Sequence, residues 1–192
     1  PKGELDYLPA GRNHAMVIEG SRGCPYDCAY CFFARGKSVK FFPLERMLAE
    51  IDEIYSAPNV TQVFFADSDI FVKKDRARAI IEHLYKYNDR DIQTEFEINI
   101  RNINEEIVSI LTKLTNFRFT MAVQTCNETA LDIMGRIFIS VEGFKEKVRS
   151  FRKWAPGSEF SVDVIVGLPG DTLEGFRHTL DVCLKLKVPK IA

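Results

Sequence analysis

Short apolar runs alternate along the chain with longer segments in which apolar side chains recur every three or four residues. This alternation predicts β-strands separated by α-helices. Strands are predicted over residues 15–18, 60–65, 92–100, 117–123 and 160–166, with a further strand cut off as it begins at 190–192. Helices are predicted over residues 43–55, 75–87, 104–114, 128–134, 141–154 and 172–186. Because a helix separates most strands from the next, the strands should pair in parallel with right-handed crossovers.

The predicted strands carry polar side chains on one face and apolar side chains on the other. In the third strand Glu95 and Glu97 flank Phe96, and the same alternation places Gln124 and Asp163 on the polar face of the next two strands. A parallel sheet covered on both faces should instead be almost wholly apolar. An open sheet with one wet face is the simpler alternative, but it fits poorly with so many crossover helices. We therefore expect an α/β fold whose sheet curls into a partial barrel with a binding site in its lumen.

Composition and charge exclude several classes of protein. Hydrophobic residues make up 46% of the 192 residues and charged residues 28%, which is typical of a globular domain and not of a disordered tail. The 26 Lys and Arg residues balance 27 Asp and Glu residues, which argues against an electrostatic nucleic-acid binder. No apolar run approaches the roughly 18 residues of a membrane span. The chain starts at Pro1 without a methionine, so we expect an excerpt of a longer polypeptide.

Three of the five cysteines lie within eight residues, at the spacing C-x3-C-x2-C formed by Cys24, Cys28 and Cys31. Three clustered thiols cannot all pair locally, so a disulfide scaffold is a poor interpretation. Soft thiolates on a short loop suit an iron–sulfur cluster or zinc. A closed structural zinc site uses four ligands, and Cys126 and Cys183 are poorly suited to supply the fourth. A cubane cluster held by three thiolates would keep one iron open for a small chelating ligand.

The cysteine motif and the strand pattern together resemble the radical S-adenosylmethionine (SAM) superfamily, from about Leu8 to the end of the chain. The resemblance implies a partial (β/α)6 barrel, its last strand truncated in this chain, and a 4Fe–4S cluster on Cys24, Cys28 and Cys31. It implies that the open iron binds SAM, and that one electron cleaves SAM to a 5′-deoxyadenosyl radical that abstracts a substrate hydrogen. A core domain over residues 14–192 would follow a linker at residues 1–13.

The same resemblance implies which residues surround SAM. Tyr30, the aromatic residue before the third cysteine, would lie near the adenine, and the backbone near Val166 and Gly167 would line the adenine pocket. Asp67 and Ser68 stand where many members carry Gly-Gly-Glu, and they are similar to an acidic variant found in cobalamin-binding members. A turn followed by a helix cap is the alternative interpretation of this segment.

Gln124 and Arg136 resemble the Gln…Arg pattern of oxygen-independent coproporphyrinogen oxidases and methylthiotransferases. The resemblance implies that the glutamine reaches the ribose and that the arginine pairs with the SAM carboxylate, which a guanidinium matches bidentately. The alternative interpretation of Arg136 is a structural one, in which its positive charge interacts favourably with the end of a helix. Glu97 and Asp163 would accept hydrogen bonds from the amino group or the ribose hydroxyls.

Other residues near the motif have simpler interpretations. Arg22, Arg35, Lys37 and Lys40 flank the cysteine loop. A solvated basic loop is the favoured interpretation, and guidance of an acidic reductase is the alternative. Cys126 falls at the expected rim of the lumen, where a buried structural cysteine is favoured over a second reactive thiol.

The resemblance leaves the reaction open. Residues 5–12, 21–26 and 67–76 look like the corresponding segments of cobalamin-binding members, which implies methylation or rearrangement of an unactivated carbon with cobalamin bound by a domain outside this chain. Methylthiotransferase-like sulfur insertion is one alternative, and a non-catalytic iron–sulfur or zinc binding module is another. Expected partners are a small-molecule or peptide substrate and an electron donor such as flavodoxin or ferredoxin, with no nucleic acid and no membrane. The oxygen sensitivity of such clusters suggests the cytoplasm.

Overall fold

The computed structural model describes Pro9 and residues 11–34, 38–136 and 139–192. Most of the linker predicted over residues 1–13 therefore lies outside the described residues, as do Arg35 and Lys37. Within the described ranges, strands and helices alternate as the hydrophobic pattern predicts.

Six parallel strands form one open sheet with β1 at one edge and β8 at the other. In spatial order they are β1 (His14–Ile18), β4 (Val60–Phe65), β5 (Gln93–Glu97), β6 (Phe117–Gln124), β7 (Ser161–Val164) and β8 (Lys190–Ile191). Chain order and spatial order agree, as expected when each crossover returns the chain to the next position in the sheet. The predicted α/β fold with a partial (β/α)6 barrel is confirmed.

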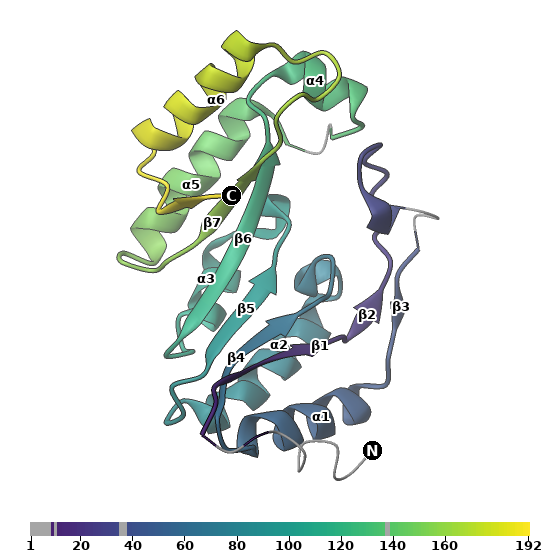
Figure 1. Cartoon of the computed structure of the whole chain (residues 1–192), viewed down its shortest axis with the longest axis vertical. Helices are drawn as coiled ribbons and strands as arrows, with labels where there is room; N and C mark the ends of the chain where they lie inside the picture. The colour runs from purple at the N-terminus through teal and green to yellow at the C-terminus, as the bar shows by residue number, and fades with distance from the viewer. Residues whose placement is uncertain (1–8, 10, 35–37, 137–138) are drawn as a thin grey trace.

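Helices cover one face of this sheet, whereas the cysteine loop stands to the side of the strands, above β2 (Ser21–Arg22) and β3 (Lys40–Phe41) (Figure 1). In the described ranges the α-helices are α1 (Leu44–Ser56), α2 (Lys74–Leu84), α3 (Glu105–Leu111), α4 (Glu128–Ile133), α5 (Val141–Trp154) and α6 (Leu173–Lys185). The Asn104 side chain caps the start of α3, because it accepts a hydrogen bond from Ile107 N at 2.9 Å. No helix of the described residues is long and apolar enough to cross a bilayer.

The hydrophobic core lies between the sheet and the helices. Phe65 and Phe96, on neighbouring strands, have ring centroids 4.9 Å apart, and Phe119 of β6 meets Phe151 of α5 edge-on at 5.0 Å. All four rings are fully buried. The period-2 alternation of β5 then directs Glu97 to the opposite face. The polar face of the barrel predicted from this alternation is thus confirmed.

The third strand ends earlier than its apolar pattern predicts. β5 stops at Glu97, and a 3-10 turn, η5 (Ile100–Asn102), replaces the end of the strand predicted to reach residue 100. The Asn99 side chain accepts a hydrogen bond from Arg101 N at 3.0 Å and so starts the turn. A local side-chain bond of this kind competes with the sheet ladder for the backbone.

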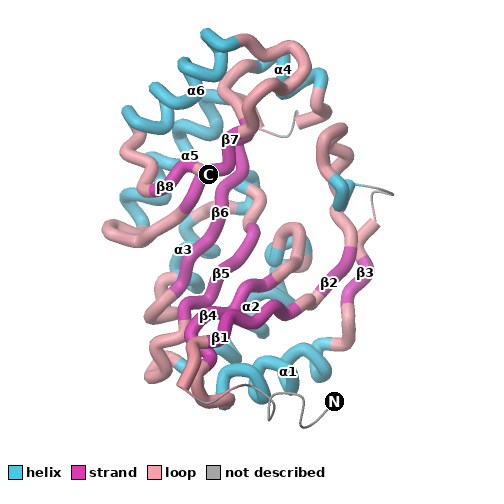
Figure 2. The backbone as a smooth tube through the Cα atoms, viewed as in Figure 1, coloured by secondary structure: helices cyan, strands magenta, loops and turns pink. Residues whose placement is uncertain are grey.

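A short hairpin carries the cysteine loop and stands beside the main sheet (Figure 2). Its strands, β2 (Ser21–Arg22) and β3 (Lys40–Phe41), are antiparallel. Gly23 follows β2 with φ of +95°, and a β-carbon there would lie 2.1 Å from Ser38 O. Only glycine permits both this backbone conformation and this close approach. The hairpin therefore closes the base of the cysteine loop.

Candidate functional site

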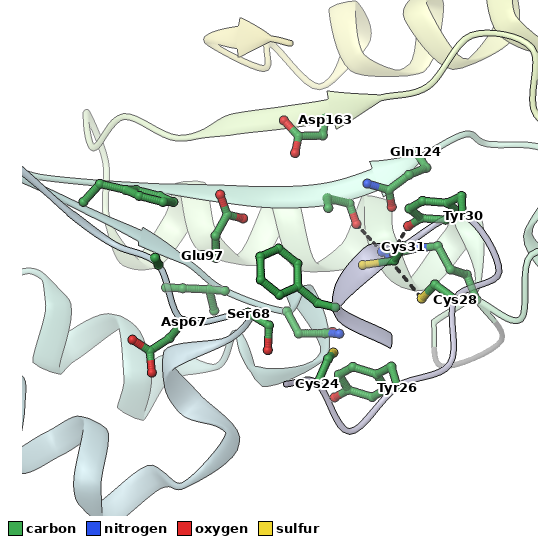
Figure 3. Close-up of a pocket in the computed structure, with 17 residues that line it drawn as sticks. Cys24, Tyr26, Cys28, Tyr30, Cys31, Asp67, Ser68, Glu97, Gln124 and Asp163 are labelled. Carbon is green, nitrogen blue, oxygen red and sulfur yellow. Dashed lines mark hydrogen bonds between the residues drawn. The ribbon is translucent and has the colours of Figure 1, made fainter. Parts of the chain in front are cut away.

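A cavity of about 360 Å³ lies at the carboxyl ends of the strands, between the cysteine loop and the polar face of the sheet (Figure 3). Parallel α/β barrels place their sites at this end. Of the residues predicted to form the site, the cavity wall includes Cys24, Cys28, Tyr30, Cys31, Asp67, Ser68, Glu97, Gln124, Arg136 and Asp163. These residues come from segments far apart in the sequence, and the fold brings them to one space.

The three cysteines of the motif face this cavity from one loop. Cys28 is buried, and Cys24 and Cys31 are half-buried. Cys31 N donates a hydrogen bond to Cys28 O at 3.0 Å, which makes the loop turn tightly. Burial raises the pKa of the Cys24 thiol, the neighbouring Cys31 and Cys28 raise it further, and a Ser68 hydrogen bond lowers it. A cationic metal centre would relieve the cost of placing thiolates so close together.

The donor set fits an iron–sulfur cluster. Among the described residues, no three His, Cys, Asp or Glu side chains are grouped so that they could hold a metal ion. The thiolates of a 4Fe–4S cube bind different irons, so they need not converge on one point. Cys24, Cys28 and Cys31 are the residues that would hold such a cluster, and their soft sulfur ligands match it.

Asp67 holds the start of the cysteine loop. Its Oδ2 accepts a hydrogen bond from Gly20 N at 2.9 Å, and its Oδ1 accepts one from the Ser21 hydroxyl at 2.5 Å. Ser68 continues the attachment by donating its hydroxyl to Gly23 O at 2.8 Å. Burial is the main cause that raises the pKa of Asp67. Both carboxylate oxygens of this predicted SAM contact are therefore bonded to the protein itself.

Asp69 caps a short helical turn, in agreement with the alternative interpretation of this segment as a turn followed by a helix cap. Its side chain accepts a hydrogen bond from Phe71 N at 3.0 Å and so caps the turn η3 (Ile70–Val72). Asn102 donates to its other oxygen at 2.6 Å. Burial raises the pKa of Asp69 to about 7 despite these bonds. The carboxyl group thus holds the turn after β4 and does not line the cavity.

Gln124 sits in an unusual backbone conformation at the end of β6. Its φ is +65°, and the β6–β7 register shifts between Ala122 and Gln124. The backbone is held there by a 2.9 Å hydrogen bond from Ile165 N to Gln124 O. The side-chain Oε1 of Gln124 is buried and has no hydrogen-bond partner among the described residues. A buried acceptor without a donor, next to a cavity, marks a place for a ligand group.

Glu97 and Asp163 give the cavity a negative wall. Their carboxylates extend from β5 and β7 toward the same space (Figure 3). Burial, followed by the charges of Asp163, Glu95 and Asp69, raises the pKa of Glu97 to about 7. Burial likewise raises the pKa of Asp163, although Lys190 and Arg136 lower it. A ligand that brings positive charge to this wall would be stabilised by both carboxylates.

Arg136 is a buried cation that reaches both the cysteine loop and the sheet. Its Nη1 donates to the Tyr30 hydroxyl at 2.9 Å and lies 3.8 Å from Cys28 Sγ, and its Nη2 donates to Ala122 O. Burial raises the pKa of Tyr30, so its phenol stays protonated. The predicted contact between Arg136 and a SAM carboxylate stays a prediction, because the bonds found here go to the protein.

Val166 and Gly167 do not line the cavity. β7 ends at Val164, and the two residues lie in the turn that follows, where Val166 is 72% exposed. Gly167 has φ of +78°, a conformation that leaves the extended strand. The strand predicted to reach residue 166 is therefore shorter, and the expected backbone contact with adenine stays a prediction.

The sequence interpretation did not assign Tyr26, Phe33, Phe64 and Asn99 to the ligand site, yet they line the cavity. Asn99 shares the parity of Glu97, so its position was readable from the strand pattern. Cys126 is absent from the cavity wall and is buried in the core, where burial raises its pKa to about 12. The interpretation of Cys126 as a structural cysteine agrees with this position.

Comparison with known proteins gives one family match and a set of distant relatives. The sequence model of the Radical SAM superfamily matches residues 18–183. The heme chaperone HemW of Lactococcus lactis is 23% identical over 175 residues, which cover 88% of this chain and 45% of that protein. The threonylcarbamoyladenosine tRNA methylthiotransferase MtaB of Thermotoga maritima is 27% identical over 186 residues, or 91% of this chain and 42% of the relative. The chain thus spans less than half the length of these curated relatives.

A solved structure shares the fold. The radical S-adenosylmethionine methyltransferase TsrM from Kitasatospora setae superimposes with a TM-score of 0.79 at 17% identity, over 94% of this chain and 35% of that one. That structure contains a tryptophan substrate and a SAM analogue, and a second one contains cobalamin and a [4Fe-4S] cluster. At this level of identity the similarity establishes the architecture only.

Proposed function

This chain belongs to the radical SAM superfamily, and on that premise we propose that it is the core of an enzyme that binds a 4Fe–4S cluster and SAM in the cavity at the strand ends. The observation that carries the proposal is the shared cavity: Cys24, Cys28 and Cys31 face it from one side, and the unpartnered Gln124 Oε1 borders it from another. A reduced cluster of this type supplies the electron that cleaves SAM and starts hydrogen abstraction from a substrate.

The charges of the cavity match those of SAM. SAM carries a sulfonium and an ammonium cation, and the carboxylates of Glu97 and Asp163 border the same space. We assign the unpartnered Gln124 Oε1 to a ribose hydroxyl, because it needs a donor. Tyr30, at the cavity wall, would pack near the adenine. These residues bind and orient SAM, and the burial of the wall strengthens each interaction by excluding water.

For the reaction itself, our first candidate is cobalamin-dependent methylation or rearrangement of an unactivated carbon. The fold shared with TsrM supports it, and cobalamin would be bound by a domain outside this chain. Methylthiotransferase-like sulfur insertion is the second candidate, because MtaB is among the relatives. The balanced charge of the chain gives the second candidate no support of its own. A substrate that is a small molecule or peptide, a flavodoxin- or ferredoxin-like electron donor and a cytoplasmic setting complete the proposal.

Anaerobic reconstitution with iron and sulfide tests the proposal. We expect about four irons per chain, and an electron paramagnetic resonance (EPR) spectrum of the reduced protein that changes when SAM is added. 5′-Deoxyadenosine should form under reducing conditions. Replacement of Cys28 with alanine should abolish the cluster, whereas Cys183→Ala, a matched change in the core away from the cavity, should retain it. Zinc in place of iron, or a spectrum that ignores SAM, would favour a non-catalytic metal module.

A further inference from the structure

The Arg136 guanidinium donates a hydrogen bond to a sulfur of the cysteine loop. Nη1 lies 3.8 Å from Cys28 Sγ, within hydrogen-bond range for sulfur. Arg136 is only 8% exposed, and Cys28 is 7% exposed. Bonds to charged partners strengthen when water is excluded, so this contact is electrostatically strong. A sulfur contact was not among the roles predicted for Arg136.

Backbone contacts fix the position of this arginine. Ala29, in the cysteine loop, donates its N–H to Met134 O at 3.0 Å, so the end of α4 is bonded to the loop. Gly135 has φ of +69°, and a β-carbon there would lie 3.1 Å from Asp27 O. Arg136 N then donates to Leu131 O at 2.8 Å. The arginine and the cysteine loop therefore form one packed unit.

The side chain is held at several points as well. Nη1 donates to the Tyr30 hydroxyl at 2.9 Å, and Nη2 donates to Ala122 O on β6. These partners orient the guanidinium plane while one Nη1 hydrogen faces Cys28. Such anchoring reduces the rotamer entropy that a free arginine would lose on binding a sulfur.

We propose that Arg136 tunes the cluster, by donating a hydrogen bond to the Cys28 thiolate and thereby raising the reduction potential. This inference rests on the proposed function, because it requires the cluster on the three cysteines. Hydrogen bonds to the sulfurs and local net charge are the main protein controls on such potentials. Reduction adds one electron, delivered by an external one-electron donor, and the guanidinium keeps its protons. The buried cation stabilises the added negative charge. The reduced cluster is therefore stabilised more than the oxidised cluster.

This role differs from pairing with a SAM carboxylate in a measurable way. A residue that only binds SAM leaves the potential of the SAM-free protein unchanged. A residue that bonds to the cluster thiolate changes that potential before SAM is added. The midpoint potential of the reconstituted, SAM-free protein therefore separates the two.

The experiment is an EPR-monitored redox titration of the wild-type protein and of Arg136→Gln, Arg136→Lys and Arg118→Gln. Arg118 is a matched control, because it pairs with Glu159 at the other end of β6 from the cavity. We expect Arg136→Gln to lower the equilibrium constant for reduction at least about tenfold, which is about 59 mV for one electron. Arg136→Lys should give a smaller shift, and Arg118→Gln should match the wild type.

An Arg136→Gln variant with full iron and sulfide content and an unchanged reduction potential would overturn this inference. The proposed function would be unaffected by that result. Failure of the wild type to form a SAM-sensitive cluster would overturn the proposed function and this inference with it. If the glutamine variant does not assemble a cluster, wild-type protein carrying ¹⁵N only in the arginine guanidino groups gives the second test. Pulsed EPR should then detect a ¹⁵N coupling to the cluster, and its absence would overturn the inference.

Discussion

At the scale of single residues, Gln124 combines a strained backbone with an unpartnered side-chain oxygen. A non-glycine residue at positive φ costs about 1–2 kcal/mol, and the fold maintains it where the β6–β7 register shifts. Strain of this kind is typical of ligand sites, where it aims a side chain. The cavity gains a buried acceptor as a result.

Replacing Gln124 with glycine separates these two effects. Gln124→Gly should keep or increase the free energy of unfolding, because glycine accepts positive φ without strain. The same change should lower the affinity of the reconstituted protein for SAM about 2- to 10-fold, which corresponds to the net free energy of one hydrogen bond. Gln124→Asn, which tolerates the conformation but has a shorter amide, is the matched control for the loss of reach. Unchanged SAM affinity in the glycine variant, measured by calorimetry, would contradict the ribose assignment.

Glu97 predicts a pH dependence of SAM binding. Its pKa is raised from 4.5 to about 7, chiefly by burial, so the group is largely protonated at pH 6 and ionised at about pH 8. A cationic ligand prefers the ionised form, so SAM affinity should fall as the pH drops through about 7, with protons released on binding below that pH. Calorimetry in two buffers of different ionisation enthalpy measures this release.

The Glu97→Gln variant is the control for this dependence. It should bind SAM more weakly than the wild type at about pH 8, by roughly tenfold for the loss of one charge-assisted bond. Its affinity should vary less between about pH 6 and pH 8. A wild-type affinity that is flat over this range would contradict the assignment of Glu97.

At the scale of elements, the cysteine loop is held from three sides. The β2–β3 hairpin closes its base, the segment after β4 bonds to its start through Asp67, and the end of α4 bonds to its middle through Met134 O. None of these contacts is local in sequence. The loop therefore depends on the barrel for its shape, even though all three cysteines are close in sequence.

Two glycines of similar conformation test whether the β2–β3 hairpin shapes the cysteine loop. Gly23 and Gly157 both have positive φ, but only at Gly23 would a β-carbon meet another atom, Ser38 O at 2.1 Å. The positive φ alone should cost alanine about 1–2 kcal/mol at either position, and at Gly23 the clash adds to that cost. Only Gly23→Ala should also lower the iron content after reconstitution, because it forces the hairpin apart. Equal iron content in the two variants would show that the hairpin does not shape the loop.

At the scale of the whole molecule, the core and the cavity lie on opposite faces of one sheet. The buried rings of Phe65, Phe96 and Phe119 pack toward the helices, whereas Glu97 and Gln124 face the cavity. None of the three motif cysteines belongs to the main hydrophobic core. Stability and ligand binding are therefore carried by different faces.

This separation predicts the effect of removing the metal. Chelation of iron should leave the backbone amides of β4, β5 and β6 protected from hydrogen exchange, because their core contacts do not involve the cluster. Amides of residues 23–33 should exchange faster. Exchange measured by mass spectrometry on the loaded and stripped protein gives the comparison. Loss of protection throughout the sheet would show that the cluster is required for the fold.

The fold class, the cysteine loop and the polar lumen could all be predicted from the sequence. These features follow from local rules: apolar periodicity separates strands from helices, and side chains alternate along a strand. Glu97 and Asp163 were placed on the correct face by parity alone, and the cysteines by their spacing.

The contacts of the polar residues became visible only in the folded chain. Asp67 bonds to Gly20 and Ser21 across more than 40 positions of sequence, and Arg136 reaches Cys28 across 108. Gln124 has its positive φ where the register shifts between two strands. Hydrogen-bond partners depend on which strands become neighbours and in what register, and no local pattern encodes that information.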